Sequence, residues 1–361
     1  MKIGYLSNHN PFDKNSFSST SYYMSQALRS NPKCTVRILG NWRRPNRIID
    51  KVWKPAPRPS SLTATDFDGL DAVLSLVSTD LVSKYGSLTN IPIVHCTDAT
   101  PGFLNDFYGY DLPTEVFERE RDAYEAASLI LFSSEFMLER ALSEFGSAYA
   151  DKVVALPWGA NLDVLPSAPP QKPPIEPLKL LFMGKEWARK GGDIVIEAFR
   201  KLQSRGIAAE LHLVGGKAND VATIENVIDH GYLDKNSRKD RLTLRNLLKD
   251  VHFLLLPTRA DCTPMVVAEA NSYGIPVIAT NVGGIPSLME PGENGDMLSL
   301  EADASDYANR LMDLSANREQ YEALSRNSFR YFKRNLTWDS WSTSVIQVLH
   351  EGLGRDGIAR A

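Results

Sequence analysis

The sequence has few cysteines, no excess of basic over acidic residues and no long apolar runs. Its 361 residues include only three cysteines, Cys34, Cys96 and Cys262, which are far apart. This number argues against a disulfide framework or a zinc site and favours a reducing compartment. The formal net charge of −4 argues against wholesale nucleic-acid binding. No apolar run approaches a membrane-spanning length, and Met1 leads straight into an expected strand, so we expect a cytoplasmic protein without a secretory signal.

Several nucleotide and metal motifs are also missing. No G-x-x-x-x-G-K-[ST] is present, which excludes a Walker P-loop. The first expected strand is followed by Ser7-Asn8-His9-Asn10 and no G-x-G-x-x-G, which makes a dinucleotide dehydrogenase the least favoured enzyme class. The six histidines never fall at metal-ligand spacing, and the one Asp-x-Asp, Asp66-Phe67-Asp68, precedes an expected strand. We therefore expect no metal.

What is present is an alternation of short apolar runs with amphipathic helical stretches, which is typical of parallel α/β sheets. The runs form two series of six. The expected strands are Ile3–Ser7, Thr35–Leu39, Ala72–Val77, Pro92–Cys96, Leu129–Phe132 and Val153–Leu156, then Leu178–Met183, Ala209–Val214, Ile224–Asp229, Val251–Leu256, Val277–Thr280 and Asp296–Leu298. A proline-rich stretch over 166–177 separates the series and reads as an interdomain linker. Ligands of such sheets bind at the carboxyl ends of the strands.

The segment 258–295 is the most informative part of the chain. It places Asp261 in a loop and Glu269 inside an otherwise apolar helix. Thr263 is a good N-cap, Pro264 is favoured at the first helical position, and Met265 to Tyr273 is expected to be helical. A solvated-face glutamate is the alternative reading of Glu269, but its neighbours are too apolar for an exposed face. A buried carboxylate needs a partner, and sugar hydroxyls can supply one.

This segment resembles the retaining GT-B glycosyltransferases of family 4, the group 1 glycosyl transferases. Their signature is an acid, seven residues and a second acid, which here are Asp261, where Glu is usual, and Glu269. The strand motif reads Gly274-Ile275-Pro276-Val277-Ile278, and the following loop reads Gly283-Gly284-Ile285-Pro286-Ser287, with Ser287 where an acid is common. Glu293-Asn294-Gly295 also matches.

The resemblance implies two Rossmann-like, doubly wound domains that face a cleft. It assigns 1–168 together with 337–361 to an acceptor-side domain and 169–336 to a nucleotide-sugar-binding domain. The last helix would cross back to the first domain, with Trp338 and Trp341 anchoring it. The implied reaction moves a hexosyl unit from a nucleotide diphosphate sugar to an acceptor hydroxyl with retention, in polysaccharide or glycoconjugate synthesis, without a cofactor. The leaving phosphate acts as base, so Asp261 is not a nucleophile.

In the second domain the resemblance also implies residue roles. Lys185 and Lys190 follow an expected strand end at Gly184, and they would neutralise the departing diphosphate, with Arg189 as a supplementary contact. Lys190 is expected to be exposed in the empty cleft. The alternative is a solvated basic loop. The remaining donor contacts are Asp261 to a sugar hydroxyl, Glu269 to the ribose, and the turns formed by Thr263, Pro264, Met265, Gly215, Gly283 and Gly284.

The first domain fits the family less closely. Ser18, Ser19 and Thr20 precede a helical pattern, and they can offer hydroxyls and amides to phosphate or acceptor, or simply cap the helix. The family has a histidine after the fourth strand. Asp98 falls best at that position, whereas His95 lies inside the strand, where a core role is the commoner one. Asp98 as a cap of the next turn is the alternative.

Other questions stay open. The basic, tryptophan-containing stretch 41–60 is either a solvated loop or a contact with the acceptor or the inner membrane surface. The charged stretch 232–245 reads as an exposed loop and helix start. Rival functions are a nucleotide-sugar epimerase with the same fold and a nucleotide-sugar-binding subunit without catalysis. The base, the sugar and the glycan or lipid-linked acceptor are not specified by these motifs.

Overall fold

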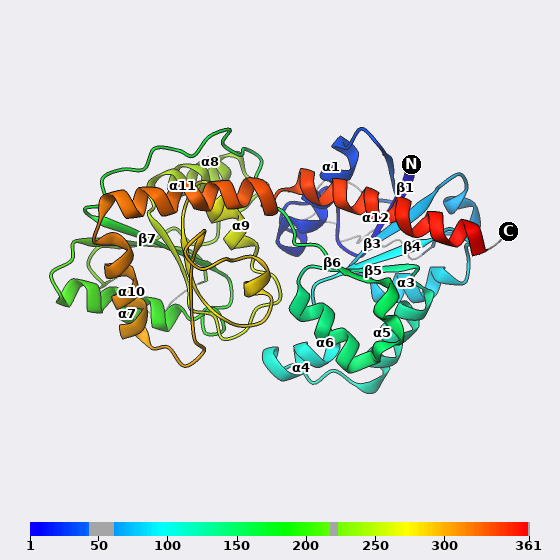
Figure 1. The fold of residues 1–361 in the computed structure, drawn as a ribbon, viewed down its shortest axis with the longest axis horizontal. Helices are drawn as coiled ribbons and strands as arrows, with labels where there is room; N and C mark the ends of the chain where they lie inside the picture. The colour runs from blue at the N-terminus through cyan, green and yellow to red at the C-terminus, as the bar shows by residue number, and fades with distance from the viewer. Residues whose placement is uncertain (43–60, 217–222, 360–361) are drawn as a thin grey trace, which may run out of the picture. The chain divides into compact units, whose positions relative to one another are not determined.

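The computed structural model describes residues 1–42, 61–216 and 223–359, and it divides the chain into two compact units. Unit 1 consists of Met1–Gly159 and Trp338–Ala361, and unit 2 of Ala160–Thr337. Each unit is a parallel sheet covered by helices on both faces (Figure 1).

Unit 1 is built on a parallel sheet with strand order β2-β1-β3-β4-β5-β6. Its strands are β1 Lys2–Ser7, β2 Thr35–Ile38, β3 Ala72–Leu76, β4 Ile93–Thr97, β5 Leu129–Phe132 and β6 Val153–Ala155. Its helices are α1 Thr20–Ser30, α3 Thr79–Gly86, α4 Pro101–Tyr108, α5 Thr114–Ala126, α6 Glu135–Phe145 and α12 Trp338–Ala359. The C-terminal α12 packs along α1, where Asn31 Nδ2 donates to Ser342 Oγ at 3.2 Å (Figure 1). Both Trp338 and Trp341 are buried.

Unit 2 repeats the architecture with strand order β12-β11-β10-β7-β8-β9, again parallel. Its strands are β7 Leu178–Gly184, β8 Ala209–Gly215, β9 Val227–Asp229, β10 Phe253–Leu256, β11 Val277–Thr280 and β12 Gly295–Leu298. Its helices are α7 Gly192–Ser204, α8 Arg238–Asp250, α9 Met265–Asn271, α10 Ala304–Ser315 and α11 Arg318–Asn335. The chain runs outward from β7 to β9 and then returns to β10 beside β7. The strand order therefore reverses between β7 and β10, and this point of a doubly wound sheet is where ligands bind.

The core of unit 2 explains why its strands are continuous apolar runs. Every residue of β10 is buried. Leu254 and Leu256 join the core cluster that includes α8 and α9, whereas Phe253 and Leu255 join the one that includes α7 and α10. Because helices cover both faces of the sheet, successive side chains are apolar on both sides.

All twelve expected strands are present, with ends that shift by up to three residues. The helix that carries Glu269 differs from expectation. It ends at Asn271 rather than Tyr273, and Pro264 rather than Thr263 occupies its N-cap. Pro264 has φ −72° and ψ 98°, so its backbone is extended and the first helical residue is Met265.

The proline-rich stretch 166–177 and the residues just before it belong to unit 2. Tyr273 Oη donates to Val164 O at 2.8 Å, and Lys172 Nζ donates to Leu248 O at 2.8 Å. Ala160 lies in the α8–α9 core cluster. These contacts attach the stretch to unit 2, so the first boundary between the units falls at 159/160, nine residues before the expected 168/169.

No helix in the described ranges is long and apolar enough to span a bilayer. The basic stretch 41–60 falls, from residue 43 onward, outside the described residues.

Candidate functional site

The strand-order reversal of unit 2 brings Lys190 against Asp261. Lys190 lies in the loop between β7 and α7, and Asp261 lies in the loop between β10 and α9. Because β7 and β10 are adjacent parallel strands, both loops leave the same edge of the sheet. Lys190 Nζ forms an ion pair with Asp261 Oδ2, and the two side chains are 13% and 5% exposed. The expectation that Lys190 is exposed was therefore wrong, because its ammonium group is needed beside a buried carboxylate.

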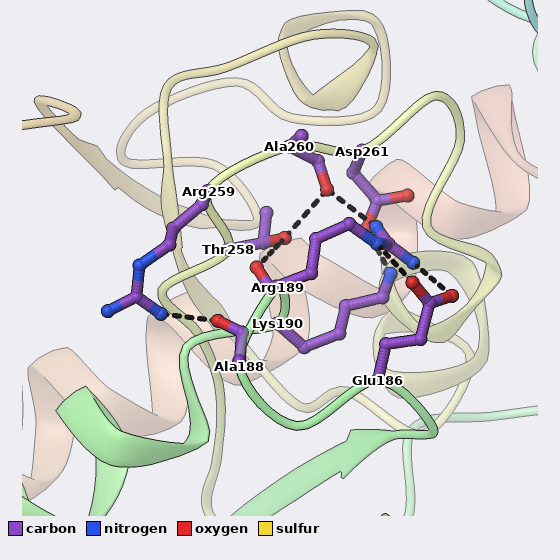
Figure 2. A network of polar contacts seen from close by, with 8 residues as sticks. All are labelled: Glu186, Ala188, Arg189, Lys190, Thr258, Arg259, Ala260 and Asp261. Carbon is purple, nitrogen blue, oxygen red and sulfur yellow. Dashed lines mark hydrogen bonds and ion pairs between the residues drawn. The ribbon is translucent and has the colours of Figure 1, made fainter. Parts of the chain in front are cut away.

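A network of polar contacts fixes these two loops to each other (Figure 2). Arg189 donates from Nε and Nη2 to the two carboxylate oxygens of Glu186, both at 2.8 Å, and from Nη1 to Ala260 O at 2.6 Å. Arg259 N donates to Arg189 O at 2.8 Å, and Thr258 Oγ1 donates to the same oxygen at 3.0 Å. Nη1 of Arg189 thus links its loop to the Asp261 loop, whereas Nε and Nη2 hold Glu186 of its own loop.

The glycine turn after β11 packs directly on the Asp261 loop. Gly284 N donates to Asp261 O at 3.0 Å. Gly283 has φ 57°, and a Cβ atom there would lie 2.1 Å from Asp261 O. Only glycine combines this left-handed backbone with so close an approach. The Gly283–Gly284 turn therefore sets where the Asp261 backbone lies.

We expect Gly283→Ala to destabilise unit 2 and to reduce any activity of this site. The left-handed backbone costs alanine about 1 kcal/mol, and displacement of the Asp261 backbone adds about 1–3 kcal/mol. Gly292→Ala is the matched control, because Gly292 has φ 82° and no atom within 4 Å of the added Cβ. Urea unfolding of the two variants separates the strain that they share from the clash. Equal losses of stability would contradict the packing argument.

Glu269 is a buried carboxylate, 2% exposed, in the middle of α9. Its Oε1 accepts from Lys235 Nζ at 2.6 Å. Burial raises the pKa of Glu269, and the neighbouring Lys235 opposes this rise. Lys235 belongs to the stretch interpreted from the sequence as an exposed loop, so it is a site residue that was missed. The need of a buried carboxylate for a cation was the available signal, but the sequence does not say which lysine supplies it.

Five other predicted residues lie at the same edge of the sheet. Lys185 follows β7 and is exposed, with Nζ 5.1 Å from the centre of the Tyr232 ring. Gly184 and Gly215 end the paired strands β7 and β8, and the next residue, Gly216, donates its N–H to Gly184 O at 2.6 Å. Thr263 and Pro264 are buried beside Asp261. Unit 2 thus brings the predicted donor-side residues to one edge.

In unit 1 the Ser18–Thr20 turn lies between β1 and α1. Phe17, Ser18 and Ser19 have φ values of 46°, 52° and 74°, a run of left-handed residues that is costly outside glycine. Ser18 is exposed, whereas Ser19 and Thr20 are buried. Ser19 is the N-cap of α1, but it makes no side-chain cap bond, and its hydroxyl donates to Lys14 O instead. The Ser19 side chain therefore does not cap α1.

His95 and Asp98 are separated by the end of β4. His95 is fully buried within the strand, and its Nε2 lies 3.6 Å from Glu120 Oε1 of α5. It is a core residue. Asp98 follows the strand and is half-buried. The next helix, α4, has Thr100 at its N-cap position, and the Thr100 hydroxyl accepts from Phe103 N at 3.2 Å.

Comparison with known sequences finds one family model and several curated relatives. Residues 177–317 match the model of the family described as Glycosyl transferases group 1. An uncharacterized glycosyltransferase of Methanocaldococcus jannaschii, MJ1178, is 26% identical over 175 residues, 47% of each chain. The amylovoran biosynthesis glycosyltransferase AmsK of Erwinia amylovora is 30% identical over 150 residues, 39% of this chain and 36% of AmsK. The chain thus spans about half the length of these relatives or less.

Solved structures match over nearly the whole chain. Sucrose-phosphate synthase of Thermosynechococcus elongatus has a TM-score of 0.72 at 17% identity, with both chains covered completely. Anabaena Alr3699/HepE, solved in complex with UDP, has a TM-score of 0.68 at 13% identity and covers 97% of this chain and 100% of its own. These likenesses establish the GT-B fold. The chain has that fold, and its residues 177–317 are similar to the Glycosyl transferases group 1 family.

Proposed function

We propose that this protein is a metal-independent, retaining glycosyltransferase that moves a hexosyl unit from a nucleotide diphosphate sugar to an acceptor hydroxyl. The observation that carries this proposal is the set of residues at the strand-order reversal of unit 2. There the lysine–carboxylate pair of Lys190 and Asp261 lies against the Gly283–Gly284 turn, and Lys185 lies in the same loop as Lys190, directly after β7. Such a site offers cations for a diphosphate and an oriented carboxylate for sugar hydroxyls.

The two lysines have the larger part in the chemistry. In the transfer, the acceptor oxygen forms a bond to the anomeric carbon while the bond from that carbon to the diphosphate breaks. The acceptor proton passes to an oxygen of the leaving phosphate. Negative charge grows on the diphosphate, and cations fixed beside it stabilise that charge without reorganisation. Lys190 is held in position before substrate arrives, and Lys185 is exposed to meet it.

Asp261 is assigned to hydrogen bonds with the transferred sugar. A carboxylate that already pairs with a lysine is a weak nucleophile, but it keeps lone pairs for hydroxyl donors. This supports the scheme in which the leaving phosphate, and not Asp261, acts as the base.

The donor and the pathway follow from the comparisons as proposals. HepE was solved with UDP, so UDP-sugars are the first donors to test. AmsK is named for amylovoran biosynthesis, which supports a role in polysaccharide or glycoconjugate synthesis.

We assign binding of the acceptor, a glycan or a lipid-linked sugar, to unit 1. There Ser18–Thr20 and Asp98 lie at the carboxyl ends of β1 and β4. Action in the cytoplasm, with the basic stretch 41–60 contacting the inner membrane surface, is part of this proposal.

A panel of UDP-, GDP- and ADP-sugars tests the proposal. Thermal shift identifies the donor, and transfer to candidate acceptors is then followed by NMR, which reads the anomeric configuration of the product. Retention and full activity in EDTA are expected. Consumption of the sugar nucleotide to an epimer without acceptor would favour an epimerase. Binding without any turnover would favour a non-catalytic subunit.

A further inference from the structure

Lys235 and Glu269 form a further ion pair at the carboxyl edge of unit 2. Lys235 lies in the segment between β9 and α8, and its Nζ is 2.6 Å from Glu269 Oε1. The two side chains are 19% and 2% exposed. The same ammonium donates to Asn161 O at 3.1 Å, so a backbone oxygen from a distant part of unit 2 fixes its position as well.

No other charged group in the described part of the chain pairs with this carboxylate. Of the elements packed on α9, β11 is apolar apart from Thr280, and α11 contributes Ser325, whose hydroxyl donates to Gly274 O at 2.6 Å. The nearby Tyr273 hydroxyl donates to Val164 O. The ionised state of Glu269 therefore depends on Lys235, because burial alone raises the pKa of the carboxyl.

The pair also distinguishes the two oxygens of the carboxylate. Oε1 accepts from Lys235, whereas Oε2 makes no hydrogen bond within the described ranges. An ionised carboxylate with one oxygen held and the other available is suited to accept a hydroxyl from a ligand.

We propose that Lys235 is a positioning residue of the donor site, which holds Glu269 by Oε1 so that Oε2 accepts a ribose hydroxyl of the bound nucleotide. This inference rests on the proposed function. Lys235 acts through Glu269 and not on the nucleotide itself. Its effect must therefore disappear when the carboxylate is removed.

The test measures binding of UDP, GDP and ADP by calorimetry at several pH values. In Lys235→Met we expect affinity for the preferred nucleotide to fall roughly ten- to hundredfold at neutral pH. The loss should shrink as the pH rises, because a buried carboxyl without its cation gives up its proton only at higher pH. Lys235→Arg keeps the charge and should retain the wild-type pH profile. Lys239→Met, which removes an exposed lysine from α8 without touching Glu269, is the matched control and should bind normally.

The double variant Lys235→Met with Glu269→Gln decides between direct and indirect action. It should bind no more weakly than Glu269→Gln alone, and because both charges are gone it remains informative if Lys235→Met unfolds. A further loss in the double variant would show that Lys235 contacts the nucleotide itself and would overturn the inference. A loss in Lys235→Met that does not change with pH would also overturn it. Normal binding by Lys235→Met would refute only this inference, whereas failure of the wild type to bind any nucleotide would refute the proposed function with it.

Discussion

Replacing Lys190 with methionine is expected to lower sugar transfer by about 10²–10³-fold, the scale for loss of one preorganised charge stabiliser. Methionine keeps most of the length of the side chain and removes only the ammonium group. The structure adds a second expectation. Because Asp261 is 5% exposed and pairs with Lys190, the variant leaves a buried carboxylate without its cation. Breaking one side of such a pair costs about 3–5 kcal/mol, so the melting temperature should fall as well.

The double variant Lys190→Met with Asp261→Asn separates these two effects. Removing both charges should recover most of the lost stability, as measured by thermal unfolding, because no unpaired ion remains. Transfer should remain low, because the cation beside the diphosphate is still missing. If the double variant recovers transfer together with stability, Lys190 is a structural partner of Asp261 and not a phosphate contact.

The second large effect is expected for Glu269→Gln, which should weaken nucleotide binding about tenfold or more. The change keeps the size of the side chain but replaces a hydrogen bond to a charged acceptor, worth about 1.5–3 kcal/mol, by one to a neutral amide. The pH dependence of nucleotide affinity is a more specific test of the role of Glu269. Burial raises the pKa of Glu269, so in the wild type the carboxylate is lost, and affinity falls, as the pH drops through that raised value. Above it the affinity should be constant.

Calorimetry of both proteins from neutral to acidic pH measures this difference. The glutamine variant still reports the titration of the nucleotide's own phosphate, so the part of the pH dependence that it lacks belongs to Glu269. Glu301→Gln, an exposed change of the same charge, should behave as wild type. An unchanged affinity in Glu269→Gln would assign this residue to the fold instead of the donor site.

The sequence by itself determined the fold class, because the strands of a parallel sheet covered on both faces are continuous apolar runs. Runs such as Leu254–Leu256 and Val277–Thr280 appear as strands at nearly their expected positions. It also determined which residues follow strand ends, since a loop begins where the apolar run stops. Lys190, Asp261 and Gly283 could be assigned to one edge for that reason.

Only the tertiary structure decided which charges meet. Lys190 pairs with Asp261 across 71 positions, and Lys235 with Glu269 across 34. The first pairing requires β10 to return beside β7, and apolar periodicity carries no signal for that strand order. Arg189 is another example. The sequence shows only a basic residue in a loop, whereas in the structure its Nη1 donates to Ala260 O of the Asp261 loop. The sequence indicates that a buried carboxylate needs a cation. Which lysine supplies that cation depends on how distant chain segments pack together.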